Sequence, residues 1–310
     1  MIDFFSFLRY ILYMNMTKEV QEIKEDKKLF KAGFAAIVGR SNVGKSTLLN
    51  ALVGTKIAIV TEKAQTTRQP IHGILHDPRG QIVFVDTPGM LLKSKDKLTK
   101  TLNQRAKESL EGVDIVVYMV DPTRAIGGEE QLLLRGLEKT KTPKILVINK
   151  IDIPDPKYIE DYREMGKQFD RVVELSAMKN RHIKTLVNTV FEFLPEGEPI
   201  YPEFQMTNID NKFWFSEIIR EKIFHQFYQE VPYNINVVVD EIEKRDNGTL
   251  YIHSLIEVND GRYKKMIIGH NGRKIKEIGS SARRDLEKII GEKIFLDLEV
   301  DVNPRWVERV

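Results

Sequence analysis

The sequence contains no cysteine among its 310 residues, which excludes disulfide frameworks and thiolate metal centres. This absence fits a reducing compartment, and we expect a cytoplasmic protein. The net charge is only +3, too small for the overall charge to identify a partner. With 42% hydrophobic and 30% charged residues, the composition predicts an ordinary globular protein, and the length suggests about two domains.

The N-terminal stretch, residues 1–16, is apolar and aromatic, but it is too short to span a bilayer and carries Asp3 and Arg9. It also lacks the basic leader and the small-residue cleavage site of a signal peptide. Three interpretations remain open: a segment at a membrane surface, a helix packed on the body of the protein, or an over-extended start. We favour the last, with translation beginning at Met14 or Met16, and assign residues 1–29 to a leader of uncertain structure.

A glycine-rich octapeptide follows the apolar run at residues 33–38 and precedes a helical pattern at residues 47–52. Its spacing, G-x-x-x-x-G-K-S between a strand and a helix, is that of the phosphate-binding P-loop. The two glycines let the backbone turn so that its N–H groups converge on phosphate oxygens. Lys45 is expected to reach the β and γ phosphates, and Ser46 to bind Mg²⁺. The predicted nucleotide contacts here are Gly39, Arg40, Ser41, Asn42, Val43, Gly44, Lys45, Ser46 and Thr47.

The polar stretch at residues 61–68 follows the P-loop helix and precedes an alternating strand at residues 69–76. A loop at this place in a nucleotide-binding domain lies over the γ-phosphate. A threonine in it completes the Mg²⁺ shell only while that phosphate is present, which makes the loop a nucleotide-sensing switch. We predict Thr67 rather than Thr66 as the metal ligand.

A second acidic element follows the next strand. The apolar strand predicted at residues 81–85 ends in the tetrapeptide Asp86-Thr87-Pro88-Gly89. An aspartate at the end of a strand beside the P-loop can hold Mg²⁺ through water, and a glycine there can bring its backbone N–H to the γ-phosphate. We therefore predict that Asp86 contributes to the metal site and that all four residues contact the nucleotide.

A third element specifies the base. The strand predicted at residues 144–148 ends in an N-K-x-D sequence at residues 149–152. The Asp152 carboxylate can accept two N–H bonds from guanine, whereas adenine would leave this carboxylate mismatched. We therefore predict that the nucleotide is GTP. The other expected contacts are Lys150 over the base face, Asn149 linking this loop to the P-loop, and a backbone N–H of Ser176 or Ala177 on guanine O6.

Position 90 bears on the rate of hydrolysis. Many GTPases have a glutamine there to orient the attacking water, whereas this sequence has Met90, which cannot hydrogen-bond a water usefully. We therefore expect unaided hydrolysis to be slow unless another group supplies the polarity. The Asn42 side chain can do so by coordinating a monovalent cation such as K⁺ where an arginine finger would sit; a substrate contact or a turn-forming role is the alternative. The predicted catalytic residues are Lys45, Thr67, Gly89 and Asn42.

The order of these elements predicts an α/β P-loop GTPase domain, with a mostly parallel sheet and helices on both faces. The second and third strands would form a hairpin through the turn at residues 77–80. A run with three prolines follows the last helix and predicts a stiff, extended linker. We place the GTPase domain at residues 30–195, the linker at 196–208 and a second domain at 209–310.

The second domain has the order α-β-β-α-α-β. The helix and strand patterns lie at residues 213–228, 234–242, 250–258, 263–268, 273–290 and 293–302, with an Asn-Gly turn between the first two strands. The two consecutive helices flank Gly269-His270-Asn271-Gly272. This order predicts an α+β KH domain of type II, in which the G-x-x-G loop clamps the backbone of single-stranded RNA.

The local charge supports RNA binding. Eight basic residues and one acidic residue lie between positions 262 and 284, and a basic face beside a glycine clamp is typical of phosphate binding. Ile267, Ile268 and Ile275 would line an apolar groove for the bases. The predicted RNA contacts are Lys264, Lys265, Ile268, Gly269, His270, Asn271, Gly272, Arg273, Lys276 and Arg283.

A GTPase domain with these motifs, a proline-rich linker and a C-terminal KH domain resembles the bacterial Era family. The resemblance covers nearly everything after residue 30, and an apolar residue at position 90 is similar to the family's habit. Two features depart from it: the leader is longer than usual, and His270 stands where a basic residue is frequent, so its contact with phosphate depends on its protonation. The matching segments are 39–46, 63–68, 86–89, 149–152, 195–201 and 268–272.

The resemblance implies a GTPase that assists assembly of the 30S subunit, with a KH domain that binds the single-stranded 3′ end of small-subunit rRNA. It also implies peripheral association with the inner membrane. We interpret the protein as a monomeric, nucleotide-gated RNA chaperone, in which GTP orders the loops around Thr67 and Gly89 and their arrangement sets the pose of the KH domain. Two hypotheses compete: an RNA-binding module in which GTP only stabilises the fold, and a membrane-linked signalling GTPase.

Overall fold

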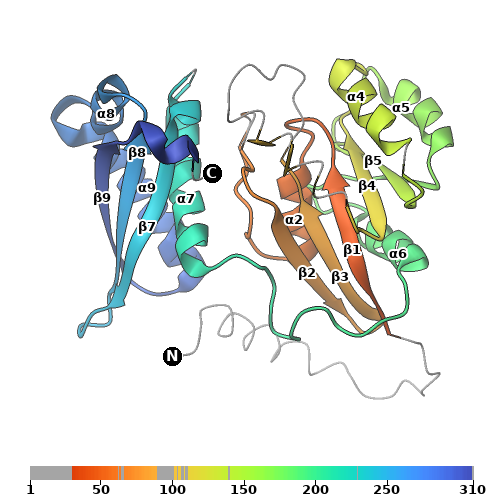
Figure 1. Ribbon diagram of the computed structural model, residues 1–310, viewed down its shortest axis with the longest axis horizontal. Coiled ribbons are helices and arrows are strands. Elements are labelled where there is room, and N and C mark those ends of the chain that lie inside the picture. The colour runs from red at the N-terminus through yellow and green to blue at the C-terminus, as the bar shows by residue number, and fades with distance from the viewer. Residues whose placement is uncertain are drawn as a thin grey trace. The chain divides into compact units, whose positions relative to one another are not determined.

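The computed structural model shows two compact units (Figure 1). The first comprises Met1–Ala58 and Ala64–Asn208, and the second comprises Ile59–Lys63 and Ile209–Val310. The expected leader, Gly89 and Met90 lie outside the described residues. The structure describes residues 30–61, 63, 66–88, 101–102, 104–105, 108, 111–138, 140–228 and 230–308.

The first unit is built on a six-stranded sheet in the order β2-β3-β1-β4-β5-β6. β2 is antiparallel to β3, and the other neighbouring strands run parallel. Most of these strands are near-continuous apolar runs, as expected where both faces of a sheet are covered. The predicted α/β class and the β2–β3 hairpin are confirmed. The strands are β1 Lys31–Val38, β2 Ile71–Asp77, β3 Gly80–Asp86, β4 Ile115–Val120, β5 Lys144–Ile148 and β6 Arg171–Glu174.

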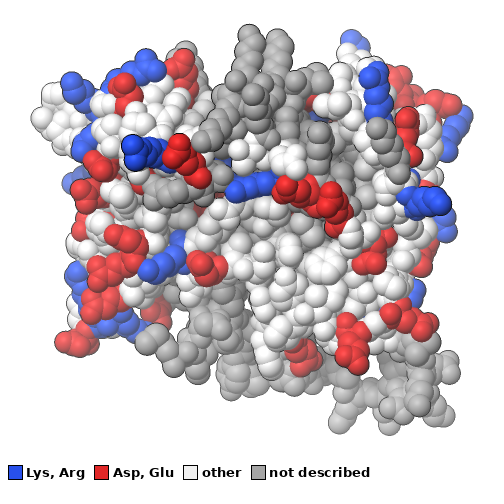
Figure 2. Space-filling view, viewed as in Figure 1, with Lys and Arg blue, Asp and Glu red and all other residues white. Residues whose placement is uncertain are grey.

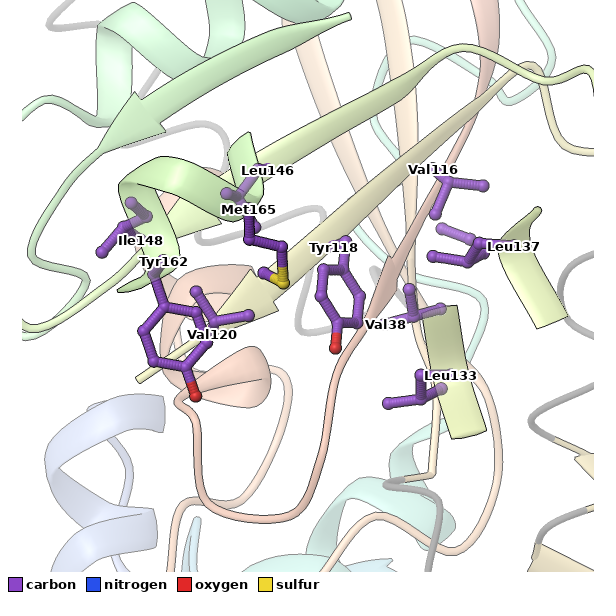
Figure 3. Close-up of a cluster of buried hydrophobic side chains, with 11 residues drawn as sticks. Val38, Val116, Tyr118, Val120, Leu133, Leu137, Leu146, Ile148, Tyr162 and Met165 are labelled. Atoms are coloured by element: carbon purple, nitrogen blue, oxygen red, sulfur yellow. The ribbon is translucent and has the colours of Figure 1, made fainter. Parts of the chain in front are cut away.

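Helices cover both faces of this sheet. The helices α4 (Gly128–Leu137) and α5 (Ile159–Met165) pack on one face, where Figure 3 shows Tyr118 of β4 among apolar side chains of both helices and of the neighbouring strands. The helices α2 (Lys45–Val53) and α6 (Ile183–Phe193) contact each other. α2 lies on the opposite face, against β2 and β3. The pattern at residues 47–52 predicted α2, whereas the seven residues of α5 are too few for a clear period.

The linker after α6 is bound along the first unit (Figure 1). The buried side chain of Gln81 accepts hydrogen bonds from the backbone N–H groups of Ile200 (2.7 Å) and Tyr201 (2.9 Å). Its Nε2 donates to the Tyr201 carbonyl at 2.8 Å, and Thr207 forms a β-bridge with Gly73 of β2. The proline-rich linker is therefore attached to β2 and β3. Its composition alone predicted stiffness but not this attachment.

The second unit has a three-stranded sheet in the order β7-β8-β9, antiparallel and then parallel. One face of α9 is buried through residues spaced four apart, such as Ile278, Ala282 and Leu286, and α9 also contacts α7. The predicted α-β-β-α-α-β order is confirmed. The elements are α7 Asn211–Gln226, β7 Ile235–Lys244, β8 Leu250–Val258, α8 Gly261–Ile268, α9 Arg273–Ile290 and β9 Ile294–Val302.

Short 3-10 segments that the sequence patterns did not predict lie at Gly166–Gln168, Val231–Asn234, His270–Gly272 and Pro304–Glu308. Among the residues that the structure describes, no helix has both the length and the apolar character needed to cross a membrane.

Candidate nucleotide site and nucleic-acid interface

The loop between β1 and α2 contains the predicted phosphate-binding residues. Gly44 has φ 106°, in the left-handed region, and a Cβ on it would lie 2.5 Å from Nδ2 of Asn149. That same Nδ2 donates to the Val43 carbonyl at 2.8 Å. The absence of a side chain at position 44 therefore lets Asn149 reach the loop, as the sequence analysis expected for an asparagine in this motif.

Lys45 is buried inside the curve of the loop. Its Nζ donates to the carbonyls of Gly39 at 3.1 Å and Arg40 at 3.0 Å. Burial lowers the pKa of Lys45, and the negative charge of Asp86 opposes this shift. An anionic phosphate beside this amine would stabilise its charged form, as is typical of a phosphate-binding lysine.

Three oxygen-bearing side chains from separate elements converge beside Lys45. The Ser46 hydroxyl donates to Asp86 Oδ2 at 2.7 Å, and the Thr67 hydroxyl donates to the same oxygen at 3.1 Å. The two hydroxyl oxygens are themselves 3.1 Å apart. Residues 46, 67 and 86 are thus brought together from the start of α2, the segment before β2 and the end of β3.

The environment of Asp86 fits a divalent cation. Its carboxylate is 0% exposed, and Oδ1 has no hydrogen-bond partner among the residues that the structure describes. Burial raises the pKa of Asp86, whereas Lys45 and the two hydroxyl hydrogen bonds favour the charged form. Hydroxyl and carboxylate oxygens are the hard ligands that Mg²⁺ prefers, and a cation would compensate the buried charge. The residues present therefore suit Mg²⁺.

The predicted base-recognition residues also lie together. Asn149 Oδ1 accepts a hydrogen bond from the Ala177 backbone N–H at 3.0 Å, which joins this loop to the one after β6. Asp152 Oδ1 accepts from the Ser176 hydroxyl at 2.5 Å. Lys150 donates to Asp121 Oδ2 at 2.5 Å. These contacts orient the Asp152 carboxylate and the Lys150 side chain.

Two charged partners escaped the sequence analysis. Arg40 of the P-loop pairs with Glu130 of α4 at 2.6 Å, in a buried contact that ties the loop to that helix. Asp121, at the end of β4, is the partner of Lys150. The Glu130 carboxylate also accepts from the Gly127 N–H at 2.9 Å, so a G-x-x-E helix start was the available signal.

The remaining predicted contacts of the first unit are placed as follows. Ser41 and Asn42 lie within the loop, and Thr47 lies in the first turn of α2. Asn42 has a left-handed backbone with φ 66°. The Thr87 hydroxyl donates to the Ile37 carbonyl at 2.9 Å. Pro88, the next residue, is buried. Gly89 falls outside the described residues.

In the second unit, the G-x-x-G loop joins α8 to α9. Gly269 has φ 70° and Gly272 has φ 72°, both left-handed conformations that favour glycine. Between them, His270 and Asn271 are exposed. The turn therefore presents its backbone and two polar side chains to solvent, which is the arrangement required for phosphates to approach closely.

Basic side chains surround this loop. Lys265, Arg273, Lys276 and Arg283 are exposed, and Lys264 is half-buried with Asp301 3.9 Å away. On the face in Figure 2, Lys and Arg are interspersed with Asp and Glu.

One groove residue was predicted wrongly. Ile267 is 0% exposed, whereas Ile268 and Ile275 are partly exposed. Helical spacing places Ile267 one turn after the buried Tyr263, so both side chains belong to the inner face of α8. Ile267 is therefore part of the core and cannot line a groove for bases.

Family models match both units. The model described as "50S ribosome-binding GTPase" matches residues 34–150, and the model described as "KH domain" matches residues 230–307. The chain is 44% identical over 284 residues to GTPase Era of Carboxydothermus hydrogenoformans, which covers 89% of this chain and 94% of the relative. It is 40% identical over 285 residues to GTPase Era of Halothermothrix orenii, covering 90% and 96%.

Solved structures agree over the same span. A crystal structure of Era in complex with MgGDPNP and nucleotides 1506–1542 of 16S ribosomal RNA is 39% identical, with a TM-score of 0.84, covering 90% of this chain and 96% of that one. A variant of Aquifex aeolicus Era bound to GDP and AlF4⁻ is 38% identical, with the same TM-score and coverage.

Proposed function

Because this chain belongs to the Era family of GTPases, we propose that it is a GTP-hydrolysing switch that binds the 3′ end of small-subunit ribosomal RNA and assists 30S assembly. The observation that carries the proposal is the match to Era in complex with MgGDPNP and 16S rRNA nucleotides, which includes both the nucleotide unit and the KH unit. The family model that names the 50S ribosome matches only residues 34–150. The RNA partner proposed here is therefore the one seen with the full-length relative.

In the proposed mechanism, the P-loop backbone and Lys45 bind the triphosphate, and the Asn149–Ala177 and Asp152–Ser176 contacts orient the guanine-recognition groups. Ser46, Thr67 and Asp86 would hold Mg²⁺, which, when bound, neutralises charge on the β and γ phosphates. The chain's own contribution is thus positioning and electrostatics, as is general in phosphoryl transfer.

The switch part of the proposal requires RNA affinity to differ between the GTP and GDP forms, since a ligand indifferent to two states shifts neither. Thr67 is the residue whose environment changes with the γ-phosphate and its cation. We further propose a cytoplasmic monomer with peripheral membrane association, which vesicle sedimentation of the chain with and without residues 1–16 would test.

The experiment that tests the function uses cells depleted of the native protein and complemented with either the natural chain or Lys45→Ala. The proposal expects the variant to accumulate free subunits and incompletely processed small-subunit rRNA in sucrose gradients. Normal subunit profiles with Lys45→Ala would favour an RNA-binding module for which GTP is only a structural ligand.

A further inference from the structure

A short segment after α2, residues Ile59–Lys63, belongs to the second compact unit although the chain on both sides of it belongs to the first. The backbone N–H of Val60 donates to Glu221 Oε1 at 3.0 Å. Glu221 lies on α7 and is 2% exposed. The neighbouring Lys222 Nζ also contacts this carboxylate, at Oε2, 3.5 Å away. A buried carboxylate oxygen that accepts a backbone hydrogen bond favours one position of the donor segment, because giving up that hydrogen bond costs free energy.

A second contact holds the same segment. Lys63 Nζ lies 4.9 Å from the centroid of the Tyr228 ring, within the range of a cation–π interaction. Tyr228 follows α7 and is 76% exposed. An exposed aromatic ring of this size has no packing role in the core. Its contact with Lys63 gives it a role in holding the segment.

The segment is covalently close to the proposed metal cluster. Thr67, whose hydroxyl contacts both Ser46 and Asp86, is four residues after Lys63. Four residues span at most about 14 Å of extended chain. Loss of the γ-phosphate would change the position of Thr67. The attachment of residues 60 and 63 to Glu221 and Tyr228 would either limit that movement or transmit it to α7.

On the other side, α7 is connected to the G-x-x-G loop through α9. Lys222, next to Glu221, forms an ion pair with Asp285 of α9. One turn further, Gln226 donates to Glu277 of α9 at 2.6 Å. α9 begins at Arg273, directly after Gly272. A continuous set of contacts thus runs from Val60 through α7 to the helix whose N-terminus carries the proposed RNA clamp.

We infer that residues Ile59–Lys63 form a coupling strap, and that Glu221 and Tyr228 are the positioning residues through which the nucleotide state reaches the RNA clamp. This inference rests on the proposed nucleotide-dependent RNA binding and names the residues that carry it. Neither side chain touches the reacting atoms. Their substitution therefore changes the coupling between nucleotide state and RNA binding, and leaves the sites that bind the nucleotide and the RNA intact. The strap acts by having different preferred positions with GTP and with GDP, while α7 favours one of them.

The test measures a coupling factor, defined as the RNA dissociation constant with GDP divided by that with a non-hydrolysable GTP analogue. The probe is a fluorescent single strand copied from the small-subunit rRNA 3′ end, and the full chain is used throughout. The informative variants are Glu221→Met, which removes the acceptor, and Tyr228→Leu, which removes the ring. Glu221→Gln and Tyr228→Phe keep the acceptor oxygen and the ring, and Phe295→Leu changes an exposed aromatic on β9 as a matched control.

We expect Glu221→Met and Tyr228→Leu to reduce the coupling factor about three-fold or more, while the three control variants keep the natural value. By linkage, RNA must change the ratio of the affinities for the analogue and for GDP by the same factor. A natural chain without coupling would overturn the proposed gating itself. A natural coupling factor in both Glu221→Met and Tyr228→Leu would contradict the role of residues 59–63 and leave the proposed gating intact. If the buried Glu221 variant fails to fold, Tyr228→Leu alone still tests this role.

Discussion

We propose that base recognition depends on a single carboxylate, that of Asp152, whose Oδ1 accepts from the Ser176 hydroxyl at 2.5 Å. Changing Asp152 to Asn leaves one acceptor and adds a donor, which matches a purine with a carbonyl at C2 better than guanine. Because hydrogen bonds to charged groups contribute about 1.5–3 kcal/mol, GTP affinity should fall roughly 13- to 160-fold. Isothermal titration with GTP and with xanthosine triphosphate measures the change.

The affinity for xanthosine triphosphate should rise in the same Asp152→Asn protein. Ser176→Ala serves as the matched control, since it keeps the carboxylate and removes only the group that orients it, so a smaller loss for GTP is expected without any gain for xanthosine triphosphate. Equal losses for both nucleotides in Asp152→Asn would place base recognition elsewhere.

Hydrolysis is expected to depend on the monovalent cation through Asn42. This residue lies in the P-loop with φ 66°, and Met90 supplies no polar group for the attacking water. We predict faster turnover in K⁺ than in Na⁺ of equal ionic strength, and loss of that difference in Asn42→Ala. Phosphate release under saturating GTP is the measurement. Identical rates of the natural chain in the two salts would remove Asn42 from the catalytic set.

Residues inside local motifs could be predicted from sequence, because the spacing itself fixes their neighbours. Ser46 and Asp86 are examples, since each directly follows a recognisable strand or loop. Glu130 and Asp121 could not be found this way, because their partners Arg40 and Lys150 are distant in sequence and only the fold joins them. Ile267 was misjudged because three adjacent apolar positions on a short helix do not reveal which one faces the core.

At the scale of elements, the G-x-x-G turn is the feature most open to a controlled test. Gly272 and Gly291 both have left-handed backbones, at φ 72° and 77°, and a Cβ on either would meet no atom within 4 Å. A non-glycine residue should therefore cost each site a similar amount, about 1–2 kcal/mol. Gly272→Asp also places a negative charge where phosphates are proposed to bind, whereas Gly291→Asp lies at the far end of α9.

We predict that Gly272→Asp abolishes measurable RNA binding while Gly291→Asp binds like the natural chain, with similar decreases in melting temperature for both. Fluorescence anisotropy and thermal unfolding give the two readings. If RNA affinity falls equally in both variants, lost stability explains the decrease, and the G-x-x-G turn has no specific role in RNA binding.

The stability that comes from attachment of the linker to the first unit should decrease in acid. His72 of β2 shares a 2.8 Å hydrogen bond with the Tyr201 hydroxyl, and burial lowers the pKa of His72 below its ordinary value of 6.5. The unfolded chain therefore takes up a proton before the folded one. The stability that depends on neutral His72 is fully present above pH 6.5 and is lost as the pH falls from 6.5 through the folded-state pKa.

Urea midpoints at pH 7.5 and 5.5 test this for the natural chain and for His72→Phe, which cannot take up a proton. We expect the natural chain to lose more stability over this interval than the variant does, since other titrating groups are common to both. Parallel losses would show that His72 does not contribute to the acid sensitivity.

Element types were predicted well wherever a period of several turns or a clear strand was present, as for α9 and β8. The attachment of the linker was not, because Gln81, His72 and Tyr201 are ordinary surface-type residues in the sequence, and their partners are more than 100 positions away. Similarly, residues 61–63 belong to the stretch predicted as a polar loop at residues 61–68, and that prediction did not indicate that residues 59–63 belong to the second unit, where Val60 and Lys63 have contacts.

At the scale of the whole molecule, the chain combines a GTPase unit and a KH unit. If it acts as a switch, the guanine nucleotide and the RNA must each change the affinity of the chain for the other. The overall charge of +3 offered no guide to this, because the basic residues of α8 and α9 are balanced elsewhere. The order of motifs along the chain was informative instead, since it identified both units separately. What order could not provide was the route of communication, for which the strap at residues 59–63 is proposed.

The most direct test of this account is the affinity of the natural chain for the single-stranded 3′ end of small-subunit rRNA, measured by fluorescence anisotropy first with a non-hydrolysable GTP analogue and Mg²⁺ and then with GDP. We predict tighter binding with the analogue. Equal affinities in the two nucleotide states would contradict the switch and leave two independent binding domains on one chain.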